Sequence, residues 1–183
     1  MDYNMIRLLQ KMNVKAVTFG VETGSAVIQN RSKKKLDIST VIPTVLKTNE
    51  AGIRTLTFFM LGHPGETEED INDTLSLIKQ LSKHCKRRNY ISINIVCPYP
   101  GTGYWDYANE KYGKFIDFYN ESYKYYHQAR PCVNLTDMDD QVFYSYIDRI
   151  RHFSNFVNVR HRVFQSIENP IRTLIQIKKK LSL

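Results

Sequence analysis

Three short glycine-containing stretches carry the residue types from which this sequence could build a ligand site. They are FGVETGS at 19–25, LGHPGET at 61–67 and CPYPGT at 97–102, and each closes an apolar run. Glycine lets the backbone approach a ligand closely, and the free N–H groups of a helix start favour anions or hydrogen-bonding atoms. The first stretch adds a carboxylate, Glu22, of the kind that accepts hydrogen bonds from paired ribose hydroxyls. Each stretch alone is more typical of a structural turn, but three in this order favour a site.

Alternating strands and helices must position these stretches. The apolar runs at 14–21, 53–61 and 91–96 are rich in β-branched and aromatic residues, which predicts buried strands. Helices are predicted at 3–12, with Asn13 as a left-handed cap, and from Asp37 or Ser39 to Gly52. A third helix begins at Thr67 through a capping box with Asp70. The alternation indicates a parallel sheet, in which ligands bind beyond the carboxyl ends of the strands.

The pattern changes after Thr102. Residues 104–126 are dense in tyrosine and phenylalanine without clean periodicity, and packing is favoured over a cavity lining for Tyr119, Tyr123, Tyr125 and Tyr126. Thr136, with Asp139 at the capping-box position, predicts a helix that continues to about Ser166. A basic amphipathic helix is predicted at 171–181, after the Asn169–Pro170 break. The pattern therefore indicates an α/β half with a helical tail after it.

Composition restricts the classes of protein. With 183 residues and 42% hydrophobic residues, the sequence suits one globular domain or a fragment of one. No apolar run reaches the ~18 residues of a membrane span, and the N-terminus lacks the order of a signal peptide, so a cytoplasmic location is predicted. The net charge of +8 is spread over clusters that suit solvated helix faces better than a nucleic-acid or acidic membrane surface.

The cysteines and histidines show no metal-ligand spacing. Cys85, Cys97 and Cys132 are far apart, which predicts ordinary reduced thiols, with Cys97 a buried structural one. His63 lies within the second glycine-containing stretch. Two interpretations of it stay open: contact with a substrate, or an exposed loop histidine without chemistry.

The series FGVETGS, helix, FFMLGHPGET, helix, NIVCPYPGT resembles the later half of the radical S-adenosylmethionine core domain. It is most similar to the group whose members often carry an upstream cobalamin-binding domain, and the NLT-x-x-D segment resembles the stretch after the core in that group. The resemblance implies a partial (β/α) barrel with three parallel strands and then an α-helical tail. It assigns residues 1–105 to the C-terminal half of the core barrel and 106–183 to an aromatic-rich linker and helical extension.

The resemblance also implies which residues bind the cofactor S-adenosylmethionine. The first turn would hold the ribose and amino-acid portion, and a basic residue beyond it would meet the cofactor carboxylate. The second strand and turn would pass the adenine, and the third strand would present an apolar wall to it. These expectations fall on Gly20, Glu22, Gly24, Ser25, Lys33, Lys34, Phe59, Met60, Gly62, Pro64, Val96, Cys97 and Pro98.

One departure from the family is as informative as the matches. The CxxxCxxC loop, whose thiolates hold a 4Fe–4S cluster in the family, does not occur in this sequence. We therefore expect a truncated product, a split half or a degenerate relative that is inactive alone and has no catalytic or metal-binding residue of its own. The cluster ligands would come from a possible complementary N-terminal half that carries this loop, and the substrate would be a small molecule or one of unknown kind. Cobalamin is a further cofactor of the family.

Two other functions compete with this hypothesis. The chain could be a non-catalytic module that keeps the turns for an adenosyl ligand, or for an interaction, without redox chemistry. A weaker alternative is a basic nucleic-acid-binding protein, which rests on charge alone.

Overall fold

The computed structural model describes residues 2–85, 88–113 and 133–168, and for 160–168 it describes the backbone alone. The predicted tyrosine cluster, Cys132 and the basic helix at 171–181 lie outside the described residues.

Three parallel strands form the sheet, and this confirms the predicted α/β fold class with its partial-barrel arrangement. The strands β1 (Ala16–Glu22), β2 (Arg54–Leu61) and β3 (Asn89–Ile95) are hydrogen-bonded in the order β1-β2-β3. Each strand lies within two residues of its predicted position. The register between β1 and β2 shifts between Gly20 and Glu22, which places a β-bulge at the carboxyl end of β1.

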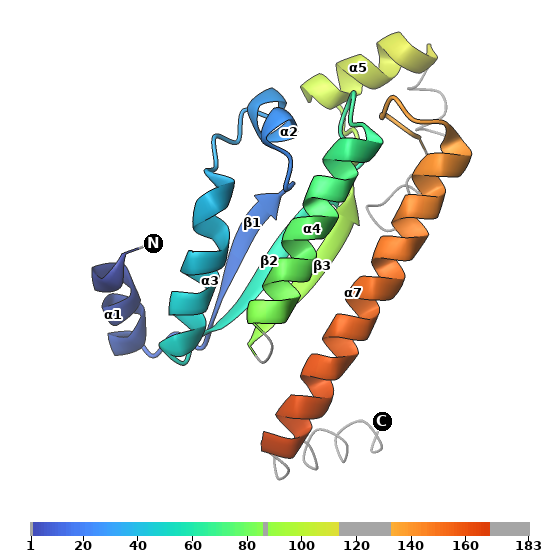
Figure 1. Cartoon of the computed structure of the whole chain (residues 1–183). Coiled ribbons are helices and arrows are strands. Elements are labelled where there is room, and N and C mark those ends of the chain that lie inside the picture. Colours follow the sequence, from blue (N-terminus) through green and yellow to red (C-terminus); the bar gives the residue numbers. More distant parts are fainter. Residues whose placement is uncertain (1, 86–87, 114–132, 169–183) are drawn as a thin grey trace, which may run out of the picture.

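The long helices cover one face of this sheet. Figure 1 shows α3 (Val41–Glu50), α4 (Glu68–His84) and α7 (Asp140–Glu168) on the same side of the strands. Alternate strand residues point into this layer, and the core between sheet and helices includes Val21, Phe59, Leu61, Ile91 and Ile95. The 3₁₀ turn η1 (Ile38–Thr40) precedes α3, and the side chain of Asp37 caps it by accepting from Ser39 N. The N-terminal α1 (Tyr3–Lys11) ends before Asn13, whose φ of 56° confirms the predicted left-handed residue.

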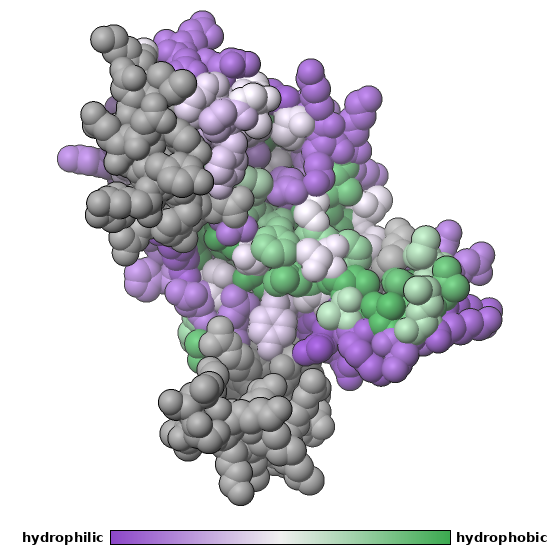
Figure 2. Space-filling model, turned by 180° about the vertical axis from the view of Figure 1, so that it is seen from behind, coloured by the Kyte–Doolittle hydropathy of each residue, from purple (hydrophilic) through white to green (hydrophobic). Residues whose placement is uncertain are grey.

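The other face of the sheet is free of the three long helices, and we call it the open face. At its carboxyl end, Met60 packs against the cluster that includes Trp105 and Ala108 of α5 (Gly103–Tyr112). Along β2 the half-buried side chains Leu56, Phe58 and Met60 alternate with the fully buried ones of the helix-covered face. Gly20 and Ser92 flank Phe58 in the sheet register and so lie on this face too. Figure 2 shows apolar side chains gathered across the middle of this side of the molecule.

Two short helices stand at the carboxyl ends of the strands. After β1, α2 (Ala26–Arg31) begins at Ser25, whose hydroxyl accepts from Ile28 N. After β3, α5 (Gly103–Tyr112) begins at Thr102, whose hydroxyl accepts from Trp105 N. The helix start predicted after the third stretch is therefore present. The domain boundary expected at residue 105 falls inside α5.

Two T-x-x-D sequences behave differently. The predicted capping box is confirmed at α4, where Asp70 N donates to Thr67 Oγ1 and Thr67 N to Asp70 Oδ2. The predicted start of α7 at Thr136 is wrong, because this helix begins at Asp140 and Asp139 O accepts its first bond from Phe143 N. Thr136 is fully buried and donates its backbone N–H to the side chain of Asn134 instead. An Asn-stabilised turn thus takes the place of the helix cap.

Candidate functional site

Glu22 ends β1 and carries an ion pair at the rim of the open face. Its carboxylate accepts from the Lys34 ammonium at 2.9 Å, with side-chain exposures of 21% and 40%. Its φ of 69° is a left-handed value that is uncommon outside glycine, and it turns the chain out of the strand. Glu22 therefore has a donor at the strand end, and this donor is in the same chain.

The absence of a side chain at Gly20 leaves room for this ion pair. A Cβ on Gly20 would lie 2.6 Å from Glu22 Oε1 and 3.1 Å from Lys34 Nζ. The two charged groups therefore lie directly over the backbone of β1, where any side chain would displace them. We call Gly20, Glu22 and Lys34 the rim pair site, and these are three residues that the sequence assigned to cofactor binding.

Two other predicted residues of the first turn bind the fold together. A Cβ on Gly24 would lie 2.7 Å from the backbone of Asp73 and Thr74, so this turn packs directly on α4. The Ser25 hydroxyl donates to the carboxylate of Asp70. Burial raises the pKa of Asp70, but the hydrogen bonds from Ser25 and Thr67 outweigh it and hold the pKa below its usual value. Gly24 and Ser25 therefore position the turn, with their contacts already made inside the chain.

The second turn is organised by a residue that the sequence reasoning missed, Glu66. Its side chain is fully buried, and Oε2 accepts from Gly62 N at 2.6 Å and from His63 N at 3.2 Å. Burial raises the pKa of Glu66 to about 8, although these two backbone hydrogen bonds oppose the rise. Oε1 has no hydrogen-bond partner among the described residues. The sequence did contain a signal for this role. In LGHPGET, Glu66 follows Gly62 by four residues, a spacing at which its side chain can accept hydrogen bonds from the backbone of its own turn.

His63 is buried rather than exposed, which corrects one of the two interpretations of this residue. It is 4% exposed, and its Nδ1 lies 2.9 Å from the hydroxyl of Tyr104. The two rings meet edge to face, with centroids 5.9 Å apart. Burial lowers the pKa of His63 to about 4, and the Met60 backbone and the Asp70 charge offset only part of this, so the ring is neutral at pH 7. Its Nε2 is buried without a hydrogen-bond partner among the described residues.

A cavity of about 560 Å³ opens beside the second turn, and we call it the turn cavity. The end of α2, the second turn and the start of α5 supply its walls. It is lined by Ile28, Arg31, Ser32, Lys33, His63, Pro64, Thr102, Gly103, Tyr104 and Tyr107. Arg31 is held at its edge by a 2.7 Å hydrogen bond from Nη1 to Gly65 O. Of the predicted site residues, Lys33 and Pro64 line this cavity, so Lys33 and Lys34 belong to different places.

The remaining predicted residues lie in two settings. Met60 is half-buried on the open face, but Phe59 is fully buried in the core under the helices, so its side chain does not reach that face. Gly62 has a φ of +89°, and a Cβ there would lie 3.0 Å from the Phe143 ring. Val96 packs with Trp105 and Leu135 in a third cluster, which Cys97 contacts as a half-buried side chain. Pro98 is buried beside them.

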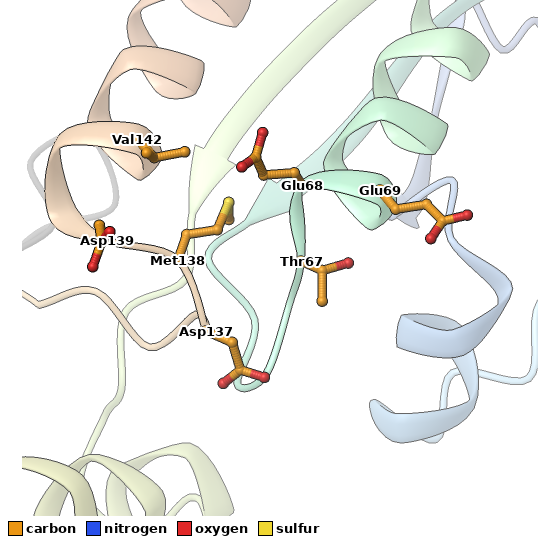
Figure 3. Close-up of a pocket in the computed structure, with 7 residues that line it drawn as sticks. All are labelled: Thr67, Glu68, Glu69, Asp137, Met138, Asp139 and Val142. Atoms are coloured by element: carbon orange, nitrogen blue, oxygen red, sulfur yellow. The ribbon is translucent and has the colours of Figure 1, made fainter.

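A second pocket, of about 500 Å³, lies between the start of α4 and the segment before α7. Its lining includes four carboxylates, from Glu68, Glu69, Asp137 and Asp139. Figure 3 shows them pointing in different directions, and Glu68 already accepts a hydrogen bond from Tyr146. The part of the chain described here holds no group of three His, Cys, Asp or Glu side chains that could bind a metal ion.

The described cysteines do not fit an iron–sulfur cluster. Cys85 follows α4 at the amino end of β3, whereas Cys97 follows the carboxyl end of that strand. Burial also raises the pKa of Cys85 to about 11, which disfavours the thiolate that a cluster needs. Any cluster that serves this site must take its ligands from elsewhere than residues 2–85, 88–113 and 133–168.

The family model described as the radical SAM superfamily matches residues 1–78, in agreement with the resemblance inferred from the turns. An uncharacterized methyltransferase of Pyrococcus horikoshii is 33% identical over 92 residues, which cover 50% of this chain and 19% of the relative. An uncharacterized protein of Methanocaldococcus jannaschii is 30% identical over 117 residues, which cover 60% of this chain and 26% of the relative. The matched part thus spans about a fifth to a quarter of these relatives. Among the described residues, no helix has both the length and the apolar character of a bilayer span.

Proposed function

We propose that this chain, whose residues 1–78 match the radical S-adenosylmethionine superfamily, supplies the adenosyl-binding side of a radical S-adenosylmethionine enzyme. The observation that carries the proposal is the rim pair site at the carboxyl end of β1. There a carboxylate and an ammonium lie over a glycine, at the edge of an open sheet face. The match to the superfamily and the position beyond a parallel strand both support a ligand at this edge.

The two charged groups suit the two ends of the cofactor. Glu22 would accept hydrogen bonds from the ribose hydroxyls, and Lys34 would donate to the carboxylate of the amino-acid portion. Because each group already faces the other in the free chain, both are desolvated in part and oriented before the cofactor arrives. Half-buried Met60 on the open face would offer an apolar surface to the adenine.

The chemistry itself would need groups from outside the described residues. Bound next to a reduced iron–sulfur cluster, S-adenosylmethionine supplies the radical chemistry of the family. We place the cluster ligands on a complementary segment that carries the CxxxCxxC loop. The name of the Pyrococcus relative, an uncharacterized methyltransferase, supports methyl transfer as the reaction to test in the completed enzyme.

Replacement of Glu22 tests the proposal. With the complementary segment present, Glu22→Ala should weaken S-adenosylmethionine binding roughly ten- to a hundredfold in calorimetry, because charged hydrogen bonds contribute about 1.5–3 kcal/mol. Glu22→Gln keeps one acceptor oxygen and should lose less. Glu50→Ala, an exposed carboxylate on α3, is the matched control. If Glu22→Ala bound the cofactor as tightly as the parent but melted much lower, Glu22 would be structural and the assignment would fail.

A non-catalytic adenosyl-binding module is the second candidate, and the separation of Cys85 from Cys97 favours it for the chain alone. Anaerobic reconstitution with iron and sulfide separates the two when it is done with and without the complementary segment. Both candidates predict no stoichiometric four-iron cluster and no cleavage of S-adenosylmethionine by the chain alone, and only the first predicts a cluster and cleavage once the segment is added. A reproducible cluster with turnover in the chain alone would overturn the view that cluster ligands come from outside.

A further inference from the structure

The turn cavity is lined by basic side chains that take no part in the rim pair site. Two basic side chains, Arg31 and Lys33, line it, and no carboxylate among the described residues does. The rim pair site, in contrast, joins one positive and one negative group. The lining of the turn cavity is therefore set for a negative ligand.

The ring of His63 supplies a polar atom that could bind a ligand in the same cavity. His63 is 4% exposed, and its Nε2 has no hydrogen-bond partner among the described residues. Burial of an unpaired polar atom costs free energy that a hydrogen bond from a ligand can recover. Nδ1 lies 2.9 Å from the Tyr104 hydroxyl, and the tautomer of the ring decides which of the two donates. In the tautomer in which Tyr104 donates to Nδ1, the proton of the neutral ring lies on Nε2, and the unpaired atom is then a donor toward an anion. Burial and nearby carboxylates raise the pKa of Tyr104, so its hydroxyl keeps its proton.

The remaining walls combine apolar and aromatic residues with the hydroxyl-bearing Ser32 and Thr102. Pro64, Tyr104 and Tyr107 present rings to the cavity, and its volume of about 560 Å³ lies in the range of small-molecule sites. Such a lining suits an organic molecule more than a bare inorganic ion, because burial of apolar ligand surface against the aromatic rings is favourable.

We propose that the turn cavity binds an organic anion, a ligand with an aromatic or apolar body and one carboxylate or phosphate group, held by Arg31, Lys33 and His63 Nε2. Anion binding here does not depend on the cofactor site. Its interpretation as the substrate pocket of the enzyme rests on the proposed function.

Histidine resonances of the full chain, labelled with ¹⁵N-histidine, test the site directly. The probes are phenyl phosphate, benzoate and the neutral benzyl alcohol, which share one ring, and His63→Gln identifies the His63 signals. We expect a saturable shift of Nε2 with at least one anion and none with benzyl alcohol, and the tighter anion tells phosphate from carboxylate. No shift with either anion, or equal binding of benzyl alcohol, would overturn the proposal.

A pair of neighbouring lysines provides the matched variants. Lys33 lines the cavity and Lys35 does not, although both are exposed and have positive φ values of 57° and 53°. Lys33→Gln should weaken anion binding roughly tenfold, since it removes a charge-assisted contact, whereas Lys35→Gln should leave it unchanged. Equal losses in both variants would mean general surface attraction and would contradict a built site.

Saturating S-adenosylmethionine distinguishes this inference from the proposed function. If both ligands bind together, the turn cavity is a separate site. If the cofactor displaces the anion, the cavity belongs to the cofactor site and the inference of a separate site is wrong. If the cofactor does not bind even with the complementary segment present, the proposed function loses its support, while the His63 titration still decides anion binding.

Discussion

Two glutamates occupy successive strand-end turns, and their surroundings give them opposite properties. Glu22 follows β1, stays 21% exposed and is paired with a half-exposed lysine. Glu66 follows β2, is fully buried and accepts two backbone N–H groups of its own turn. The first can exchange its partner for a ligand at little cost, because exposed ion pairs contribute about 0–1 kcal/mol. The second cannot, since its removal leaves buried donors unpaired. Burial, more than residue type or topological position, separates the carboxylate that we propose for binding from the structural one.

The largest effect should come from removing the buried carboxylate. We expect Glu66→Ala to lower the free energy of unfolding by about 2–4 kcal/mol, because the N–H groups of Gly62 and His63 lose their acceptor in a dry turn. Glu66→Gln keeps an acceptor oxygen and should cost less than about 1 kcal/mol at pH 7. Urea unfolding followed by circular dichroism measures both. Equal stability of Glu66→Ala and Glu22→Ala would remove the contrast between the turns.

Substitution of Gly20 and Gly24 compares the exposed ion pair with the packed part of the first glycine-containing stretch. In Gly24→Ala the new methyl meets the backbone of α4, which cannot move aside, so we expect a loss of about 1–3 kcal/mol. In Gly20→Ala it meets only the ends of Glu22 and Lys34, so stability should change by less than about 1 kcal/mol. Thermal unfolding of the two variants side by side gives the comparison. A larger loss from Gly20→Ala would mean that the rim pair is structural.

The pH dependence of stability should show the buried turn. The folded pKa of Glu66 is raised to about 8, so its contribution is lost as pH rises from about 4.5 to 8. The folded pKa of His63 is lowered to about 4, so its contribution is lost as pH falls from about 6.5 to 4. These two groups alone therefore favour a maximum between about pH 4.5 and 6.5, with limiting slopes of about 1.4 kcal/mol per pH unit.

Two variants test which residue causes the loss of stability on each side of that pH maximum. Glu66→Gln should flatten the fall of stability between pH 6.5 and 8, and His63→Gln should flatten the fall on the acid side. Urea unfolding at half-unit pH steps is the measurement. An alkaline limb that survives in Glu66→Gln would contradict the assignment to this carboxyl.

The smallest effect should come from the exposed pair. Glu22→Ala and Lys34→Ala should each change the free energy of unfolding by less than about 1 kcal/mol, and the double variant should show little coupling. A double-mutant cycle by urea unfolding provides both numbers. Coupling above about 2 kcal/mol would place Glu22 with Glu66 as a structural residue.

Local patterns predicted local structure well in this chain. The strands, α1 and the Thr67–Asp70 capping box follow from periodicity and from neighbours within a few residues. The same T-x-x-D pattern at Thr136 did not cap α7, because Asn134 competes for Thr136 N and the segment is buried against the turns. A short motif is thus reliable only where no nearby side chain offers its backbone another partner.

The site was predictable in part, and the missed portions depend on distant contacts. The family resemblance assigned Glu22 and a basic residue, Lys33 or Lys34, to one site, and the structure pairs Glu22 with Lys34. The burial of His63 depends on Tyr104, which is supplied by a helix that follows a different strand. Phe59 was placed on the wrong face because strand alternation was not carried through β2, where its neighbours Phe58 and Met60 face outward.

The bulge between Gly20 and Glu22 has a consequence for assembly. Among the described residues, β1 and β3 are the two edge strands of the sheet, so the outer row of N–H and C=O groups of β1 is available to another strand. Regular pairing can follow residues 16–20, but the extra residue at the bulge and the left-handed Glu22 interrupt the ladder there. We therefore expect an incoming strand to stop short of the rim pair. The bulge would thus limit the register in which a joining chain can pair with β1, and it would keep the backbone of that chain away from the rim pair site.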